Sequence, residues 1–193
     1  MEKERIILGI DPGTNVLGYS IIEQRGKQSQ LLKMDVLVLG TKDDLSTKMK
    51  KLFDQITEII DIFKPDILAI EAPFFGKNVQ SMLKLGRAQG ICIAAAFSRS
   101  IPFVEYSPRK VKQSITGNGA ASKEQVANML QRMFNFEAIP SYLDATDALA
   151  VAVCHSYQKE DLLVSNSSVK KTSSKKSSWA SFVSQNPDRV KKV

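Results

Sequence analysis

Cysteine and histidine are nearly absent from this chain. Its 193 residues include two cysteines and one histidine, too few for a zinc site built from thiolate and imidazole ligands. Cys92 and Cys154 lie in apolar, helix-like segments, so we expect reduced, buried side chains and no disulfide. Any metal that the chain binds should therefore be a hard cation held by oxygen ligands.

Long apolar runs are missing as well. The sequence has no stretch of about 18 consecutive apolar residues, the length that a membrane-spanning helix needs, so we predict no membrane segment. The N-terminus, Met-Glu-Lys-Glu-Arg, is charged, whereas a secretory signal has an apolar stretch and a small-residue cleavage site there. We therefore expect a cytoplasmic protein.

Basic charge is plentiful and unevenly distributed. The net charge is +7, of which +5 falls in residues 159–193. That segment is rich in Ser and Lys, and we predict a disordered tail there, following a single folded domain over residues 1–158. A basic balance favours phosphate-rich partners. Taken singly, most basic residues of the domain are equally explained as solvated helix faces; the cluster in its second half comprises Lys77, Lys84, Arg87, Arg109, Lys110, Lys112, Lys123 and Arg132.

The apolar pattern predicts an α/β fold. Strands are expected near residues 5–11, 16–23 and 30–39, and two further strands at 66–71 and 101–106. The first three are joined by short links and should be antiparallel, whereas the last two follow helical crossovers and should run parallel to the first. The expected sheet is five-stranded and mixed; helices are predicted over 45–63, 79–98, 122–136, a short segment after Ser107, and a last segment from Asp144.

Four acidic residues lie where apolar elements begin or end. Asp11 and Glu71 follow directly after two apolar strands, and Asp144 and Asp147 open the last helix on one shared face. A carboxylate is costly to desolvate. If the first and fourth strands are neighbours, all four side chains can meet at one sheet edge, as an oxygen cage for divalent cations.

Each acid also has a local explanation. Asp11 precedes Pro12-Gly13 and could be a turn former, and Glu71 could simply end a strand. Asp144 could be favoured by the helix dipole or could form a capping box with Ser141. Asp147 has the weakest local reason to be acidic. His155, near the end of the same helix, is expected to be a polar residue at the helix end.

Three motifs carry a resemblance to a known family. Gly9-Ile10-Asp11-Pro12-Gly13-Thr14, Ala69-Ile70-Glu71 and Asp144-Ala-Thr-Asp147-Ala-Leu-Ala resemble the acidic motifs of the RuvC family, the bacterial Holliday junction resolvases, which have a ribonuclease H-like fold with helices on both faces of the sheet. The match covers roughly residues 5–158 in order and spacing. Residues 159–193 have no clear counterpart in this pattern.

The resemblance implies a homodimeric endonuclease acting in homologous recombination and DNA repair. Such an enzyme cuts four-way DNA junctions by paired symmetric nicks, leaving 5′-phosphate and 3′-hydroxyl ends, and works with the RuvA-RuvB branch-migration complex. Its catalytic carboxylates, which hold two Mg²⁺ ions (with Mn²⁺ as a substitute), match Asp11, Glu71, Asp144 and Asp147.

The resemblance also implies DNA contacts. Phe74 matches an aromatic residue that wedges or stacks at the junction, although the adjacent Phe75 could take this role. Lys112 and Lys123 match basic residues near the scissile phosphate. Further contacts are expected at Lys77, at Arg109 and in the loop that contains Asn118. The helix over 79–98 is the candidate dimer contact because its small residues permit close approach; packing on its own sheet is the alternative.

Two other interpretations stay open at this point. Asp11-Pro-Gly-Thr14 also resembles the phosphate-binding hairpin of actin-like ATPases and sugar kinases, which would make the chain a phosphotransferase. That fold needs a second, duplicated domain, and the sequence contains no such repeat. The other interpretation is a nucleic-acid-binding protein that keeps the fold without catalysis, against which the presence of all four acids argues.

Overall fold

A computed structural model describes residues 4–40, 42–73 and 78–158. The prediction of a disordered tail over 159–193, and the DNA contacts predicted at Phe74, Phe75 and Lys77, lie outside the described residues. Among the residues that are described, no helix has both the length and the apolar character needed to cross a membrane. Cys92 and Cys154 are buried and free, as predicted.

Five strands form one mixed sheet in the order β3-β2-β1-β4-β5. The strands β1, β2 and β3 pair antiparallel with one another, and β4 and β5 run parallel to β1, as predicted. Ile10 of β1 lies beside Ile70 of β4, so the acids that follow them share one edge of the sheet. The strands are β1 (Glu4–Asp11), β2 (Val16–Arg25), β3 (Gln28–Val38), β4 (Ile67–Glu71) and β5 (Phe103–Tyr106).

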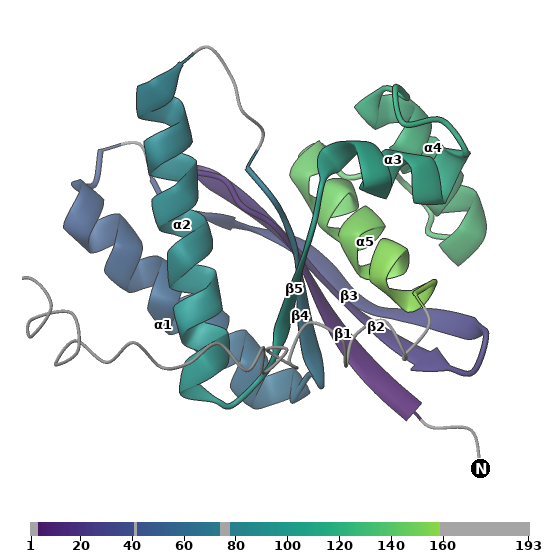
Figure 1. Ribbon diagram of the computed structural model, residues 1–193, viewed down its shortest axis with the longest axis horizontal. Helices are drawn as coiled ribbons and strands as arrows, with labels where there is room; N and C mark the ends of the chain where they lie inside the picture. The colour runs from purple at the N-terminus through teal and green to yellow at the C-terminus, as the bar shows by residue number, and fades with distance from the viewer. Residues whose placement is uncertain (1–3, 41, 74–77, 159–193) are drawn as a thin grey trace, which may run out of the picture. The chain divides into compact units, whose positions relative to one another are not determined.

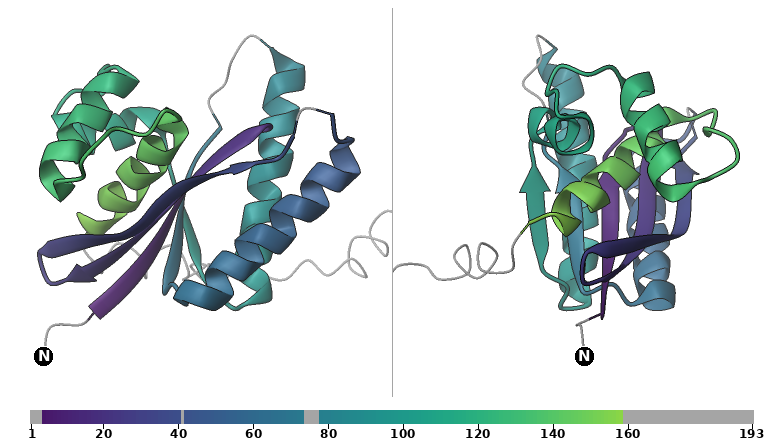
Figure 2. Two further views of the ribbon diagram at one scale, coloured as in Figure 1. Left: turned by 180° about the vertical axis from the view of Figure 1, so that it is seen from behind. Right: turned by 90° about the vertical axis from the view of Figure 1, so that its right-hand side faces the viewer.

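Helices cover both faces of the sheet, which confirms the predicted layering (Figure 1, Figure 2). Helices α1 (Leu45–Phe63) and α2 (Val79–Ser98) lie on one face. On the other face lie α3 (Pro108–Thr116), α4 (Lys123–Phe134) and α5 (Leu143–Ser156). Side chains alternate along β1: Leu8 and Ile10 enter the core beneath α1 and α2, and Ile7 enters the core beneath α5.

The helix starts follow the capping residues that the sequence offers. Ser107 caps α3 with Pro108 in its first turn, and Ser122 forms a capping box with Gln125 at the start of α4, both as predicted. Helix α5 differs, because it begins at Leu143 without a hydrogen bond from a capping side chain. The capping box considered for Asp144 therefore does not form, and capping does not account for this acid.

Helix α5 lies directly on the backbone of β1 and β2 because both strands carry glycine beneath it. A Cβ atom on Gly9 would lie 2.3 Å from the carbonyl oxygen of Ala148, and one on Gly18 would lie 1.8 Å from that of Asp144. Real Cβ atoms essentially never come so close to backbone atoms. Gly18 is also the cross-strand partner of Asp11. The first turn of α5 can therefore come down beside Asp11 only because position 18 has no side chain.

His155 lies in the last turn of α5, as the sequence suggested, but it is not a surface residue. Its side chain is fully buried in the core beneath α5. Its Nδ1 atom lies 2.7 Å from the hydroxyl oxygen of Tyr106, and its Nε2 atom contacts the guanidinium of Arg5. Burial, together with the positive charges of Arg5 and Lys110, lowers the pKa of His155 to about 4. His155 thus joins α5 to the ends of β1 and β5 as a neutral imidazole.

Candidate active site

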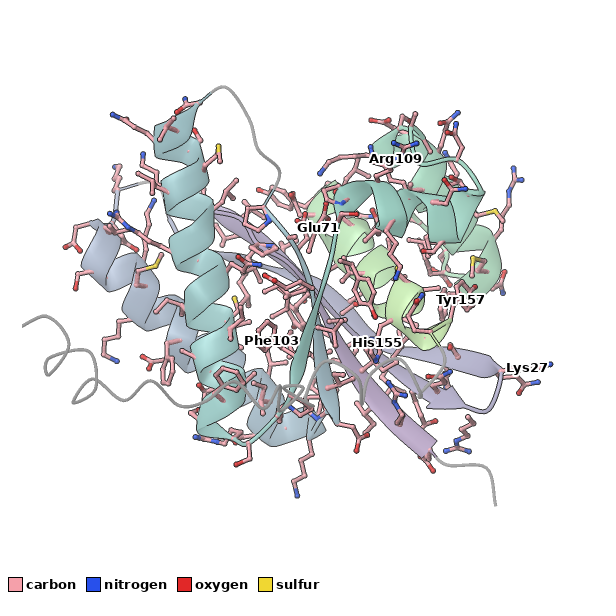
Figure 3. All side chains as sticks on the ribbon, viewed as in Figure 1. Lys27, Glu71, Phe103, Arg109, His155 and Tyr157 are labelled. Atoms are coloured by element: carbon pink, nitrogen blue, oxygen red, sulfur yellow. The ribbon has the colours of Figure 1, made fainter. Side chains whose placement is uncertain are left out.

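Three elements that are distant in the sequence bring the predicted acids together. Oxygen atoms of Asp11, Asp144 and Asp147 lie within 4.8 Å of one another. Glu71 lines the same cavity as Asp11 and Asp147, and Figure 3 shows it at the end of β4. The register between β1 and β4 places Asp11 near Glu71, and the close approach of α5 brings Asp144 and Asp147 to the same place. We call these four residues the acidic cluster.

Burial and mutual repulsion raise the pKa of three residues of the acidic cluster, Asp11, Glu71 and Asp147. Burial, followed by the charges of Glu71 and Asp147, raises the pKa of Asp11 well above its usual value. The pKa of Glu71 rises to about 7, again mainly through burial and then through Asp147. Burial also raises the pKa of Asp147, against the opposing effect of Lys123. When no cation is bound, the negative charges of these carboxylates therefore repel one another.

Lys123 partly relieves that repulsion. Its ammonium donates a hydrogen bond to Asp147, whose side chain is only 13% exposed. Burial works to lower the pKa of Lys123, but this hydrogen bond and the charges of Asp147, Asp11 and Asp144 outweigh it and raise the pKa. The capping box at Ser122 holds the start of α4, and Lys123 is the first residue of that helix. The ion pair between Lys123 and Asp147 was not foreseen from the sequence.

The donor set of the acidic cluster suits a hard divalent cation. All of its ligand atoms are carboxylate oxygens, which Mg²⁺, Mn²⁺ and Ca²⁺ prefer over nitrogen or sulfur. The pKa of each affected carboxyl is raised because its negative charge is poorly solvated and not compensated. A bound cation would compensate that charge. The residues present therefore fit the metal that the sequence analysis expected.

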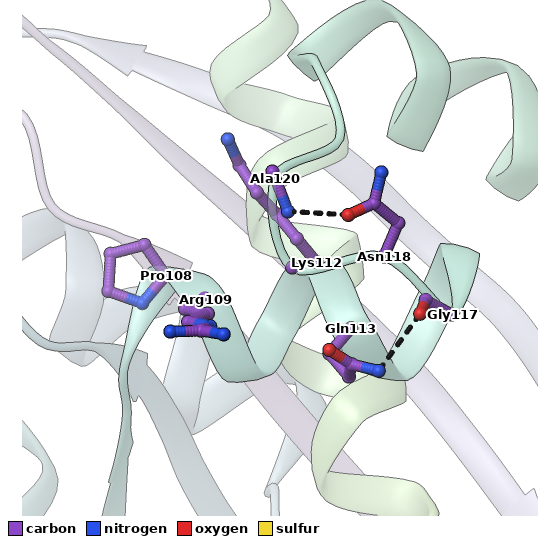
Figure 4. Close-up of a pocket in the computed structure, with 8 residues that line it drawn as sticks. Pro108, Arg109, Lys112, Gln113, Gly117, Asn118 and Ala120 are labelled. Atoms are coloured by element: carbon purple, nitrogen blue, oxygen red, sulfur yellow. Dashed lines mark hydrogen bonds between the residues drawn. The ribbon is translucent and has the colours of Figure 1, made fainter.

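A second hollow lies beside the acidic cluster. It has a volume of about 550 Å³ and is formed by α3 and the loop that follows it (Figure 4). We call it the α3 pocket. Two predicted DNA contacts, Arg109 and Asn118, line it, and Lys112 lines both this pocket and the cavity of the acidic cluster. The complete lining is Pro108, Arg109, Lys112, Gln113, Gly117, Asn118, Gly119 and Ala120.

Gln113 is a lining residue that the sequence analysis did not select. It follows Arg109 by four positions in α3, so it lies on the same helix face. That spacing was visible in the sequence and could have identified Gln113. The closing of the loop over α3 could not be foreseen, because it depends on Gly117 adopting a φ of 73° at the end of the helix.

The raised pKa of Glu71 predicts that the metal-free protein loses stability as the pH rises through about 7. The folded state then binds more protons than the unfolded state, whose glutamate has an ordinary pKa, so the free energy of unfolding falls as pH increases. Urea unfolding in EDTA should show a decrease of roughly 1 kcal/mol between about pH 6.5 and about pH 8.5. His155 acts in the opposite sense, and its effect lies mainly between its folded pKa of about 4 and the ordinary histidine value of about 6.5, so only its upper end overlaps this range and reduces the decrease.

Glu71→Gln is the matched control for this pH dependence. The amide has the same shape and does not titrate, so this variant should show a clearly smaller decrease over the same range. Saturating divalent cation should also flatten the dependence in the parent. Equal slopes for the parent and Glu71→Gln in EDTA would contradict the assignment of the raised pKa to Glu71.

Comparisons with known proteins agree with the resemblance stated from the motifs. A model of the family described as crossover junction endodeoxyribonuclease RuvC matches residues 7–155. A curated relative of that name from Cytophaga hutchinsonii is 54% identical over 190 residues, covering 98% of this chain and 90% of the relative. The one from Porphyromonas gingivalis is 51% identical over 191 residues, covering 98% of each.

A solved structure extends the similarity to three dimensions. The RuvC protein of T. thermophilus in complex with a Holliday junction substrate is 30% identical, with a TM-score of 0.74. The match covers 79% of this chain and 93% of that one. A second structure of Thermus thermophilus RuvC gives a TM-score of 0.70 at 31% identity.

The similarity extends into the C-terminal segment. The match to the Cytophaga hutchinsonii relative covers 98% of this chain, so it includes most of residues 159–193.

Proposed function

Because this chain belongs to the RuvC family of crossover junction endodeoxyribonucleases, we propose that it resolves four-way DNA junctions by metal-dependent hydrolysis at the acidic cluster. The observation that carries the proposal is the convergence of Asp11, Asp144 and Asp147 within 4.8 Å, with Glu71 in the same cavity. The helix dipole favours an acid at Asp144 in the first turn of α5, but Asp147 lies beyond that turn and has no such local explanation.

The four carboxylates are proposed to hold two Mg²⁺ ions, for which Mn²⁺ can substitute. Such ions, when bound, activate water as the nucleophile and neutralise charge on the phosphate and the leaving oxygen. Asp11 has acidic neighbours on both sides, Glu71 from β4 and Asp147 from α5, so we propose that it would help to hold both ions. The products are 5′-phosphate and 3′-hydroxyl ends.

Basic residues beside the cluster are proposed to guide the DNA backbone. Lys112 and Lys123 line the cavity of the acidic cluster, so each places an ammonium where a phosphate would enter. Arg109 and Asn118 extend the surface into the α3 pocket. Neutralisation of phosphates makes affinity fall steeply with salt, by a slope of about −0.9 for each contact. Phe74 or Phe75 remains the proposed junction wedge.

A second copy of the chain is the proposed partner along α2. The face of this helix that points away from its own sheet carries exposed apolar residues: Val79 (65% exposed), Leu83 (57%) and Phe97 (59%). Between them, Gly86 and Gly90 have no atom within 4 Å of where a Cβ would be. The opposite face buries Ala88, Cys92, Ala95 and Ala96. Both interpretations of this helix can therefore hold, one on each face.

Leu83→Asp should convert the dimer into a monomer. A carboxylate in the middle of an apolar helix pair is uncompensated and strongly unfavourable. Sedimentation equilibrium should report a dissociation constant at least about 100-fold weaker, equivalent to about 2.7 kcal/mol. Val38→Asp, at another exposed apolar position (59% exposed) on the sheet edge, should leave the assembly unchanged. A Leu83→Asp dimer as tight as the parent would place the interface elsewhere.

The dimer gives a physical reason for paired cuts. A two-fold dimer presents two acidic clusters to a substrate that is itself nearly two-fold symmetric. We infer symmetric nicks in opposed strands, with the RuvA-RuvB complex as the partner that supplies the junction. The free, buried cysteines fit a reducing bacterial cytoplasm, where the chromosomal DNA lies.

One assay separates this proposal from the two alternatives. The protein is incubated with a synthetic four-way junction, a linear duplex of the same sequence, or ATP, each with Mg²⁺ or EDTA. Mg²⁺-dependent cutting of the junction and not of the duplex supports the proposal. Binding without cutting would support a non-catalytic relative. ATP turnover would support an actin-like phosphotransferase, although the described residues form one five-stranded sheet and no duplicate of it.

A further inference from the structure

The α3 pocket opens directly beside the acidic cluster. The two hollows share two wall residues, Pro108 and Lys112. A strand whose phosphate lies in the acidic cluster would therefore place a neighbouring nucleotide at the mouth of the α3 pocket. The volume of about 550 Å³ falls within the range of pockets that hold drug-sized ligands, so there is room for one nucleobase.

The walls of the pocket are chemically suited to a base. Pro108 offers an apolar ring and Arg109 a planar guanidinium, on which a base can stack. Arg109 is held in place by the loop: a Cβ on Gly119 would lie 2.7 Å from Cγ of Arg109 and 3.2 Å from its carbonyl oxygen. The absence of a side chain at position 119 thus lets the loop backbone pack against Arg109.

Two amide side chains line the pocket. In each, one polar atom is hydrogen-bonded to the loop backbone and the other is available to a ligand. Nε2 of Gln113 donates to the carbonyl oxygen of Gly117 at 2.9 Å, and Oδ1 of Asn118 accepts from the backbone N–H of Ala120 at 3.0 Å (Figure 4). In the described part of the chain, Oε1 of Gln113 and Nδ2 of Asn118 have no hydrogen-bond partner. The pocket therefore presents one fixed acceptor and one fixed donor.

We propose that the α3 pocket receives the base of a nucleotide next to the cleaved phosphate, and that Gln113 and Asn118 read its edge. Fixed amides are the side chains that distinguish bases by paired donor and acceptor positions. A lysine-lined groove alone would neutralise phosphates without regard to sequence. This inference rests on the proposed function, and it predicts a preference for certain sequences at the cut that depends on two residues outside the acidic cluster.

Asn118→Asp tests the inference because it changes one atom of the amide. The carboxylate still accepts from the N–H of Ala120, so the loop is retained, but the donor Nδ2 is lost. Cleavage rates are measured with Mg²⁺ on a set of junctions in which the base pairs around the cut are varied. The readout is the ratio of rates between sequences, since a loss of affinity that is equal for all sequences leaves this ratio unchanged.

The expected result is a change of about tenfold in that ratio, the size of a single base contact. Gln28→Glu adds the same charge at an exposed position of β3 and should preserve the ratio. If Asn118→Asp is unfolded by circular dichroism, Asn118→Ser, which keeps an acceptor for Ala120, replaces it. Uniform slowing without a change in ratio, or a parent that cuts all sequences equally, would overturn the inference. A parent that cuts no junction would instead overturn the proposed function.

Discussion

Asp11→Asn protein should bind a four-way junction as tightly as the parent and fail to cut it. The substitution keeps the shape of the side chain and removes the charge at the position that faces both Glu71 and Asp147. Charge stabilisation by a catalytic cation is worth several kcal/mol, so we expect the single-turnover rate to fall at least about 1000-fold. Gel-shift titration in Ca²⁺ and cleavage in Mg²⁺ measure the two properties separately.

The same substitution should stabilise the metal-free protein. Burial and three neighbouring carboxylates raise the pKa of Asp11, so its charge opposes folding at neutral pH, and a neutral amide removes that repulsion. Thermal unfolding in EDTA should therefore give a higher Tm for Asp11→Asn than for the parent. Asp54→Asn, at an exposed acid of α1 paired with Lys50, is the control and should cut normally. Normal cutting by folded Asp11→Asn would refute the site assignment.

Gly18→Ala should damage the site without touching any of its acids. The added Cβ would lie 1.8 Å from the carbonyl oxygen of Asp144 and 2.3 Å from its carbonyl carbon. Both are backbone atoms that cannot rotate away, so the start of α5 must shift from β2. We expect a loss of about 3 kcal/mol in the free energy of unfolding, the upper end for overpacking. Affinity for Mg²⁺, measured by calorimetry, should weaken as well.

Ser20→Ala, two positions further along β2, should have the opposite effect on the free energy of unfolding. Ser20 is fully buried, and its hydroxyl has no hydrogen-bond partner among the described residues. Removing an unsatisfied buried hydroxyl should stabilise the fold by about 1 kcal/mol. A Gly18→Ala protein as stable as Ser20→Ala, with unchanged Mg²⁺ affinity, would show that α5 does not depend on the glycine beneath it.

Much of the fold could be predicted because its signals are local. The apolar run that ends at Asp11 and the helical spacing over 45–63 identify elements without any knowledge of their neighbours. Chain connectivity then determines strand directions, since short links join antiparallel strands and helical crossovers join parallel ones. These two considerations give the strand directions, whereas the order β3-β2-β1-β4-β5, with β1 beside β4, was only a condition of the sequence analysis and is shown by the structure.

The acidic cluster could be anticipated for a related reason. An acid directly after a buried strand lies at a predictable place, the edge of the sheet at which neighbouring parallel strands end. What the sequence could not show depends on long-range packing. Three contacts each join residues at least 24 positions apart. They are the packing of α5 on Gly18, the ion pair between Lys123 and Asp147, and the hydrogen bond between Tyr106 and His155. The α3 pocket depends on a loop conformation that composition does not encode.

The location of Asp144 and Asp147 has a consequence during protein synthesis. Helix α5 is the last described element of the chain, and it supplies two of the four carboxylates and a large part of one core. A nascent polypeptide that has not yet produced this helix has neither the complete ion-binding centre nor a cover for that side of the sheet. We therefore expect that a chain synthesised only as far as α4 cannot cut DNA, and that the site is completed when α5 has been made.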